Sequence, residues 1–209
     1  MLTAHQHHGV ASLRRFVRAL PVEVCELCGM PIPSRHGHIV EAAARRVFCV
    51  CLICGEAVTG RPDRRYRLVP ERVEVLTDFR MSDAEWHGIG LPIDMAFLFY
   101  STPEGRPVAL YPGPLGAAEA LVSEAAWRDL EARNPVLSGF EPDVEALLID
   151  RLKGRRGCYR VPIDRCYALV GIIRRRWRGM SGGDAVWQAI DDFIAALADP
   201  RTAREGWAG

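Results

Sequence analysis

Hydrophobic residues in the second half of the chain recur every three or four positions, the spacing that places them on one face of a helix. Three such stretches follow Ser123, Asp164 and Asp184, whose side chains can accept a hydrogen bond from a backbone N–H of the first turn. A fourth starts at Pro142, whose fixed backbone angle suits the first helical position. The pattern predicts helices over 123–133, 142–152, 164–177 and 184–197. The Asn134-Pro135 pair should end the first of them.

Shorter apolar runs, rich in β-branched and aromatic residues, predict strands over 66–69, 73–76, 92–100, 107–111 and 158–163. The segment YPGPLG at 111–116 is a strong turn signal. Near the start, apolar positions after Ser12 predict a short amphipathic helix that leads into a cysteine-rich segment. The Gly-, Pro- and charge-rich residues 60–66 mark a boundary. We therefore predict an α+β fold, with a metal-binding module over 1–66 packed on an α+β body of short strands and about four helices over 67–209.

Two cysteine pairs carry the strongest chemical signal in the chain. Cys25 and Cys28, and again Cys51 and Cys54, are separated by two residues, and a glycine follows the second cysteine of each pair. This spacing lets two thiolates converge on one ion while backbone amides point at the sulfurs. Two such knuckles, 22 residues apart, match a four-thiolate module of the zinc-ribbon or rubredoxin-like type. Tetrahedral sulfur ligation suits zinc or a single iron, and we expect one metal ion, zinc in preference to iron.

Three further donors lie between the knuckles. If residues 46–51 form a strand, Cys49 and Cys51 point to the same face, so Cys49 would lie near the metal and could replace Cys51 as a ligand. His36 and His38 also share a face if their segment is extended. A turn with one satisfied and one exposed histidine is the simpler interpretation. The alternative is a binuclear site, since seven donors suffice for two four-coordinate ions that share one bridging thiolate.

Composition narrows the classes of protein further. The 209 residues are 49% hydrophobic and 25% charged, with a formal net charge of +1, which excludes disorder and gives no global attraction to nucleic acid or membrane. No apolar run is long enough to span a bilayer, and the first 20 residues lack the order of a signal peptide, so we expect a cytoplasmic protein. Five of the seven cysteines fall within 25–54, which in that compartment favours metal ligation over disulfides. We interpret Cys158 and Cys166 as core residues.

A cluster of four arginines surrounds Trp177 at the end of a predicted helix: Arg174, Arg175, Arg176 and Arg178. Cations are favoured at a helix C-terminus, so a solvated or acid-paired face explains them without a partner. The alternative is a surface that docks an anionic partner. Residues 151–178 carry a net charge of +9 and residues 67–150 a net charge of −9, so internal pairing is equally available.

Several segments together resemble an uncharacterised bacterial family, a domain of unknown function encoded beside high-affinity uptake nickel-iron hydrogenases. The segments are CELCGMPIPSRHGHIV, CVCLIC, LPIDMAFLF, ALYPGPLGAAEAL, PDVEALLIDRL and VPIDRCYALVGIIRRRWRG, and the resemblance covers about residues 23–198. It implies a metal-type pattern on Cys25, Cys28, His36, His38, Cys49, Cys51 and Cys54.

The favoured hypothesis is a non-enzymatic, metal-binding accessory protein in the biogenesis or assembly of a nickel-iron hydrogenase, with a hydrogenase subunit or accessory protein as its partner. A rubredoxin-like iron protein that transfers electrons for a hydrogenase is the second hypothesis. A zinc-ribbon protein that binds nucleic acid is the third, and the near-neutral net charge argues against it.

Overall fold

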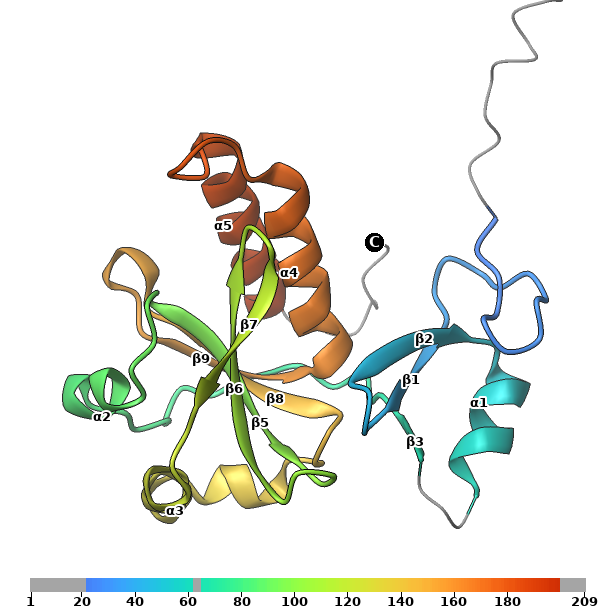
Figure 1. Cartoon of the computed structure of the whole chain (residues 1–209), viewed down its shortest axis with the longest axis horizontal. Helices are drawn as coiled ribbons and strands as arrows, with labels where there is room; N and C mark the ends of the chain where they lie inside the picture. The colour runs from blue at the N-terminus through green and yellow to red at the C-terminus, as the bar shows by residue number, and fades with distance from the viewer. Residues whose placement is uncertain (1–21, 62–64, 200–209) are drawn as a thin grey trace, which may run out of the picture.

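The computed structural model describes residues 22–61 and 65–199, and the helix predicted over 12–20 lies outside them. In this part of the chain nine strands form two antiparallel sheets, accompanied by five α-helices (Figure 1). The predicted α+β class is confirmed, and the small sheet packs on a larger body. None of the helices in the described part has both the length and the apolar character needed to cross a bilayer.

The small sheet has the strand order β2-β1-β3. It contains β1 (Gly37–Glu41), β2 (Arg46–Val50) and β3 (Tyr66–Leu68), and helix α1 (Leu52–Thr59) follows β2. Because side chains alternate along a strand, Ile39, Phe48 and Val50 pack with Cys25 in a core of their own. Val40, on the opposite face, packs into the core of the body. The small sheet ends at Leu68, two residues beyond the boundary predicted at 66.

The body is built on a six-stranded sheet with the order β4-β9-β8-β5-β6-β7. Its strands are β4 (Glu74–Val75), β5 (Met95–Ser101), β6 (Arg106–Gly113), β7 (Gly116–Leu121), β8 (Glu145–Asp150) and β9 (Gly157–Pro162). Helices α4 (Ile163–Arg176) and α5 (Asp184–Ala198) cover one face, and α2 (Asp83–Gly88) and α3 (Glu124–Arg133) lie on the other (Figure 1). Short 3-10 helices span Pro135–Gly139 and Leu152–Gly154.

The helix predicted over 142–152 is wrong, because this segment contains β8 in the middle of the large sheet. All six residues of β8 are buried. Ala146 and Leu148 pack beneath α4 and α5, whereas Leu147 and Ile149 pack against the elements of the opposite face. A strand covered on both faces is apolar at consecutive positions, and such a run also contains the three-and-four spacing of a helix.

Other predictions hold closely. Ser123 accepts a hydrogen bond from the Ala126 N–H and begins α3, which ends at Arg133 as predicted. The strand over 158–163 is β9, and 111–116 turns the chain between β6 and β7. Strand β7 and helix α2 were not predicted, although Ser82 and Glu85 form a capping box that can be recognised in the sequence.

The two parts of the chain meet along the outer face of the small sheet. Val40 and Val69 join the main hydrophobic core. Arg45, in the turn between β1 and β2, forms ion pairs with Glu119 at 2.8 Å and with Glu104. At the other end of β1, His38 Nδ1 lies 2.8 Å from Asp164 Oδ2 in the first turn of α4. Apolar packing and ion pairs thus hold the small sheet against the body.

Candidate metal centre

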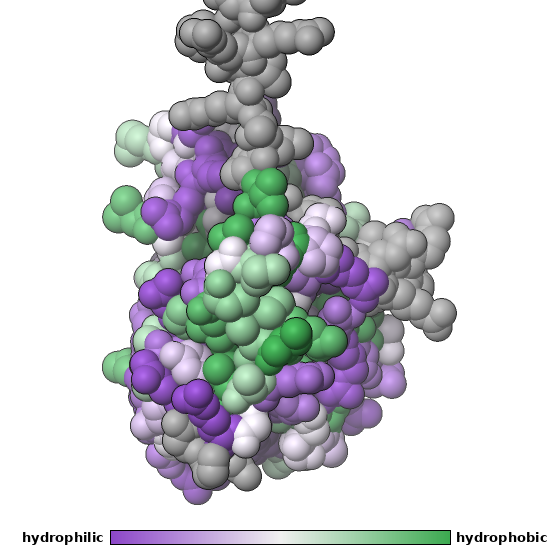
Figure 2. All heavy atoms as spheres, turned by 90° about the vertical axis from the view of Figure 1, so that its right-hand side faces the viewer, coloured by the Kyte–Doolittle hydropathy of each residue, from purple (hydrophilic) through white to green (hydrophobic). Residues whose placement is uncertain are grey.

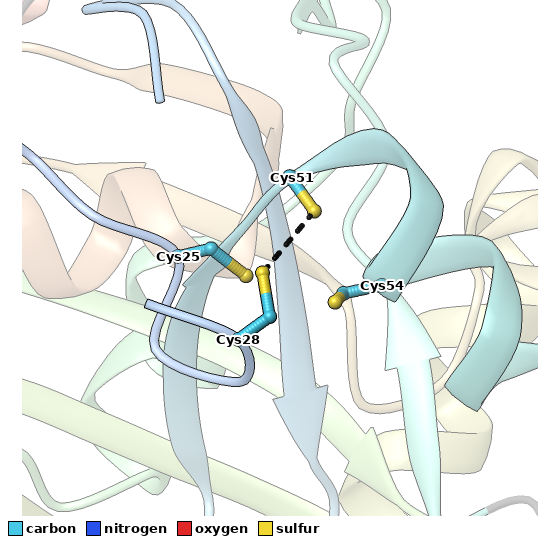
Figure 3. Close-up of side chains that lie close together, drawn as sticks. All are labelled: Cys25, Cys28, Cys51 and Cys54. Atoms are coloured by element: carbon cyan, nitrogen blue, oxygen red, sulfur yellow. Dashed lines mark hydrogen bonds between the residues drawn. The ribbon is translucent and has the colours of Figure 1, made fainter. Parts of the chain in front are cut away.

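Four cysteine sulfurs converge at one end of the small sheet. The Sγ atoms of Cys25, Cys28, Cys51 and Cys54 all lie within 4.8 Å of one another, and Cys28 Sγ and Cys51 Sγ are 3.9 Å apart. Figure 3 shows the sulfurs pointing toward a common centre, two from the loop before β1 and two from the start of α1. This arrangement matches the donor set predicted from the two knuckles. Four converging thiols can hold one metal ion with tetrahedral sulfur coordination.

The two glycines that follow the knuckles serve different purposes. Gly29 has a φ of +74°, which L-residues with a side chain rarely adopt, so it closes the tight turn in which its N–H donates to the Cys25 carbonyl at 2.8 Å. Gly55 lies inside α1 and is buried. A Cβ atom there would lie 3.4 Å from a methyl group of Val50 and 3.9 Å from Leu68. Gly55 therefore lies where α1 contacts the small sheet, and a methyl group there would make ordinary van der Waals contacts.

Backbone amides favour the thiolate form of Cys25. Burial by itself would raise the pKa of this thiol, but the N–H groups of Cys51, Cys28 and Leu27 at its sulfur lower the pKa to about 6. Hydrogen bonding to Cys28 and Cys51 raises the pKa of Cys54 to about 12. The amides aimed at Cys25 are the feature expected of a metal knuckle, since thiolates are the metal-binding form.

Cys49 belongs to a second group of donors. The ligand atoms of His36, His38 and Cys49 lie within 4.8 Å of one another, and among the described residues no member is shared with the four-cysteine group. The expectation that Cys49 and Cys51 face the same way is wrong, because β2 ends at Val50 and the chain then turns into α1. The seven donors therefore divide into four and three, without the shared thiolate of a bridged site.

The second group is surrounded by carboxylates. Burial, followed by the negative charges of Glu26, Glu23 and Asp164, raises the pKa of the Cys49 thiol. Glu26 also ties the first knuckle to β2, because its N–H donates to the Cys49 carbonyl at 2.9 Å and its carboxylate accepts from the Cys49 N–H at 2.7 Å. One glutamate thus joins the segments that carry the two donor groups.

The arginine cluster lies far along α4 from Asp164, at its C-terminal end. All four side chains are exposed. Arg178 donates to the carbonyls of Arg175 and Trp177, so it satisfies backbone acceptors at the end of α4. The other basic residues of 151–178 largely pair inside the body, as Arg155 does with Asp150 and Asp191.

The remaining two cysteines are separate from both groups. Cys166, in α4, is buried in the core between α4 and the large sheet. Cys158 packs into the core on the opposite face of that sheet. Burial raises the pKa of both thiols, that of Cys158 to about 11. Their interpretation as core residues is consistent with these positions, and neither lies in a group of potential ligands within 22–61 and 65–199.

The fold and the cysteine group define an α+β protein that carries a zinc-ribbon-like candidate metal centre. Residues 24–201 match the model of a family described as a family of unknown function, DUF5947. The chain belongs to this family, which agrees with the resemblance to a domain of unknown function. Comparison with curated proteins and with solved structures finds no match.

Proposed function

We propose that the protein is a metal-binding accessory protein of nickel-iron hydrogenase biogenesis or assembly, with one zinc ion held by Cys25, Cys28, Cys51 and Cys54. The observation that carries the metal-binding role is the convergence of four sulfurs within 4.8 Å. Zinc is preferred over iron because four protein thiolates with no open position are typical of a structural zinc ion, which has no redox chemistry. The link to hydrogenase rests on the resemblance to a family encoded beside those enzymes.

The metal has a structural task in this proposal. In the described part of the chain, the core of the small sheet contains only five buried residues: Cys25, Ile32, Ile39, Phe48 and Val50. So small a core buries too little apolar surface to hold the loop of the first knuckle and α1 in place. An ion bound to both segments joins them directly, and its binding free energy then becomes folding free energy.

Two surfaces favour a protein partner. Large apolar side chains are exposed around the cysteine knuckles, with Leu52 at 76% and Ile53 at 78%, and Figure 2 shows apolar residues gathered on this side of the molecule. Exposed apolar patches often mark protein contacts. The second surface is the arginine cluster, Arg174, Arg175, Arg176 and Arg178, which could meet an acidic region of the partner.

Metal analysis of protein purified anaerobically without added metal tests the proposed centre. We expect at least one zinc per chain, and at least one zinc fewer in Cys51→Ser and in Cys54→Ser than in the unmodified chain. Cys158→Ser is the matched control, because it removes a thiol outside both donor groups, and it should keep the metal. Full zinc occupancy in Cys51→Ser and Cys54→Ser would contradict the proposal.

Deletion of the gene in its host tests the hydrogenase role. We expect hydrogen uptake to fall and the chain carrying Cys158→Ser to restore it, whereas Cys51→Ser should not. Charge reversal of Arg174, Arg175 and Arg176 should reduce the restored activity without loss of zinc, if this surface docks the partner. Unchanged hydrogen uptake after deletion would refute the accessory role while leaving the metal centre intact.

A rubredoxin-like electron carrier is the second candidate, and the exposure of Cys28 favours it. An exposed ligand beside apolar side chains would bring a redox partner close to a single iron. Iron in the purified protein, with visible charge-transfer bands that bleach reversibly on reduction, would establish this function in place of the zinc-based one. Colourless protein that contains zinc would exclude it.

A further inference from the structure

The three donors His36, His38 and Cys49 come together on the face of the small sheet that meets the body. His38 in β1 lies directly opposite Cys49 in β2, and residues opposite each other in an antiparallel pair have neighbouring side chains. His36 lies two residues before His38, and the two imidazole rings have centroids 4.8 Å apart. The backbone pairing of two strands therefore fixes the spacing of this group.

Hydrogen bonds orient both imidazoles in the manner of metal ligands. His38 Nδ1 lies 2.8 Å from the Asp164 carboxylate, and His36 Nδ1 lies 2.9 Å from the Pro33 carbonyl. A carbonyl oxygen accepts only, so His36 carries its proton on Nδ1 and presents a lone pair on Nε2. Metal-binding histidines commonly donate the other ring N–H to a carboxylate or a carbonyl in this way.

His36 Nε2 provides an independent sign that this group binds a ligand. The side chain is only 7% exposed, and this nitrogen is buried with no hydrogen-bond partner among the described residues. A buried polar atom without a partner is costly, so native structures rarely keep one unless something binds it. A catalytic triad of Cys49, His38 and Asp164 would leave the His36 imidazole without a role. A metal ion, in contrast, would take His36 Nε2 as a ligand.

Charge around the group favours a cation. The carboxylates of Glu23, Glu26 and Asp164 all act on Cys49 electrostatically, and Glu23 Oε2 lies 3.4 Å from His36 Nδ1. Two nitrogens and a thiolate are ligands of intermediate softness, which suits Zn²⁺ or Co²⁺ better than Mg²⁺ or Ca²⁺.

We propose that His36 Nε2, His38 Nε2 and Cys49 Sγ bind a second divalent transition-metal ion of the zinc type, separate from the tetrathiolate centre. Cys49 binds as a thiolate and releases its proton to solvent. Three protein ligands leave one tetrahedral position for water or another exchangeable ligand, as in zinc sites that act on bound molecules. Because Asp164 belongs to α4, the hydrogen bond between His38 and Asp164 links this site to the body.

Titration of the metal-free full-length chain with Co²⁺ tests the proposal, because cobalt reports its ligands through its absorption spectrum. We expect two ions per chain, one with the spectrum of four sulfurs and one with weaker sulfur charge transfer. His36→Gln and Cys49→Ser should each lose the second ion and keep the first. His87→Gln is the matched control, since His87 lies outside both donor groups in the described structure, and it should bind both ions.

The outcomes separate this site from the tetrathiolate centre. Because the second site lies on strands that the tetrathiolate ion holds folded, only the reverse comparison is informative: His36→Gln and Cys49→Ser that lose the second spectrum but keep the four-sulfur spectrum support two distinct sites. Binding of a single ion by the unmodified chain, unaffected by His36→Gln and by Cys49→Ser, overturns the proposal while leaving the tetrathiolate centre intact. Retention of circular dichroism in His36→Gln would show that loss of the ion does not reflect unfolding.

Asp164→Asn tests the orientation of His38 as a positioning effect. We expect affinity at the second site to fall about 10- to 100-fold, as when outer-shell partners of ligating histidines are removed, with affinity at the four-sulfur site unchanged. Addition of azide should shift only the cobalt spectrum of the second site, because only that site has an exchangeable position. Equal weakening of both sites by Asp164→Asn, or no response to azide, would contradict the assignment.

Discussion

Removal of the metal from the tetrathiolate centre should unfold the small sheet while the six-stranded sheet stays folded. Chelation of the unmodified chain is one perturbation, and Cys25→Ser is the other. A structural zinc contributes about 10–16 kcal/mol in small zinc modules, as much as the whole stability of a typical domain of about 5–15 kcal/mol. The five buried residues described in the core of the small sheet cannot compensate for the loss of that binding free energy.

The effect on the body follows from the contacts that the two parts share. Unfolding of the small sheet withdraws Val40 from the main core, which costs about 1.5–3 kcal/mol for a fully buried valine. The partly exposed ion pairs of Arg45 with Glu104 and Glu119 add about 0.2–1 kcal/mol each. The body should therefore lose about 2–5 kcal/mol, on the order of 10 °C in melting temperature, and remain folded.

Hydrogen exchange with and without metal resolves the two parts. We expect the amides of β1, β2 and β3 to lose protection on chelation, while those of β5 and β8 keep most of theirs. Cys158→Ser serves as the control and should show the pattern of the unmodified chain. Loss of protection in β5 together with β1, or full protection of β1 in metal-free protein, would refute the division into a metal-dependent module and a self-sufficient body.

Three further predictions concern the body. Leu147→Ala, at a fully buried position of β8, should cost about 2–5 kcal/mol in urea unfolding, whereas exposed Leu121→Ala should change stability by less than about 0.5 kcal/mol; equal effects would contradict the placement of β8. Glu145→Gln removes the charge of a buried carboxylate that accepts hydrogen bonds from Arg72, and it should cost about 1.5–3 kcal/mol; an unchanged melting temperature would argue against that charged hydrogen bond. Hydrogen bonds from Arg106 and then Arg45 lower the pKa of Glu119, so its contribution of about 1 kcal/mol is complete above the unfolded pKa of about 4.3 and lost as pH falls through the folded pKa. Glu119→Gln should therefore destabilise at pH 7 and converge with the unmodified chain at pH 2, and a difference that persists there would refute the linkage.

Several features could be predicted from the sequence because they depend on interactions between residues that are close in the chain. The two knuckles specify their own geometry, because two intervening residues bring both sulfurs of a pair to one side of a turn, and the structure joins the pairs as expected. Ser123 and the Asn134-Pro135 pair bound α3 by capping and by steric exclusion, both of which act within a few residues. The apolar stripes of α4 and α5 lie on their buried faces for the same reason.

Tertiary structure decided the features that depend on what covers a segment. Residues 145–150 form a strand because helices lie on both faces of the sheet, which no local pattern reports. Cys49 joins the histidines because strand pairing sets it opposite His38, whereas Cys51, two residues later, belongs to another group. Asp164 and His38 are 126 residues apart in the sequence, and only the fold brings their side chains together. The sequence by itself therefore determined which donors the chain carries and how each pair is spaced, and only long-range packing decided how the seven donors divide.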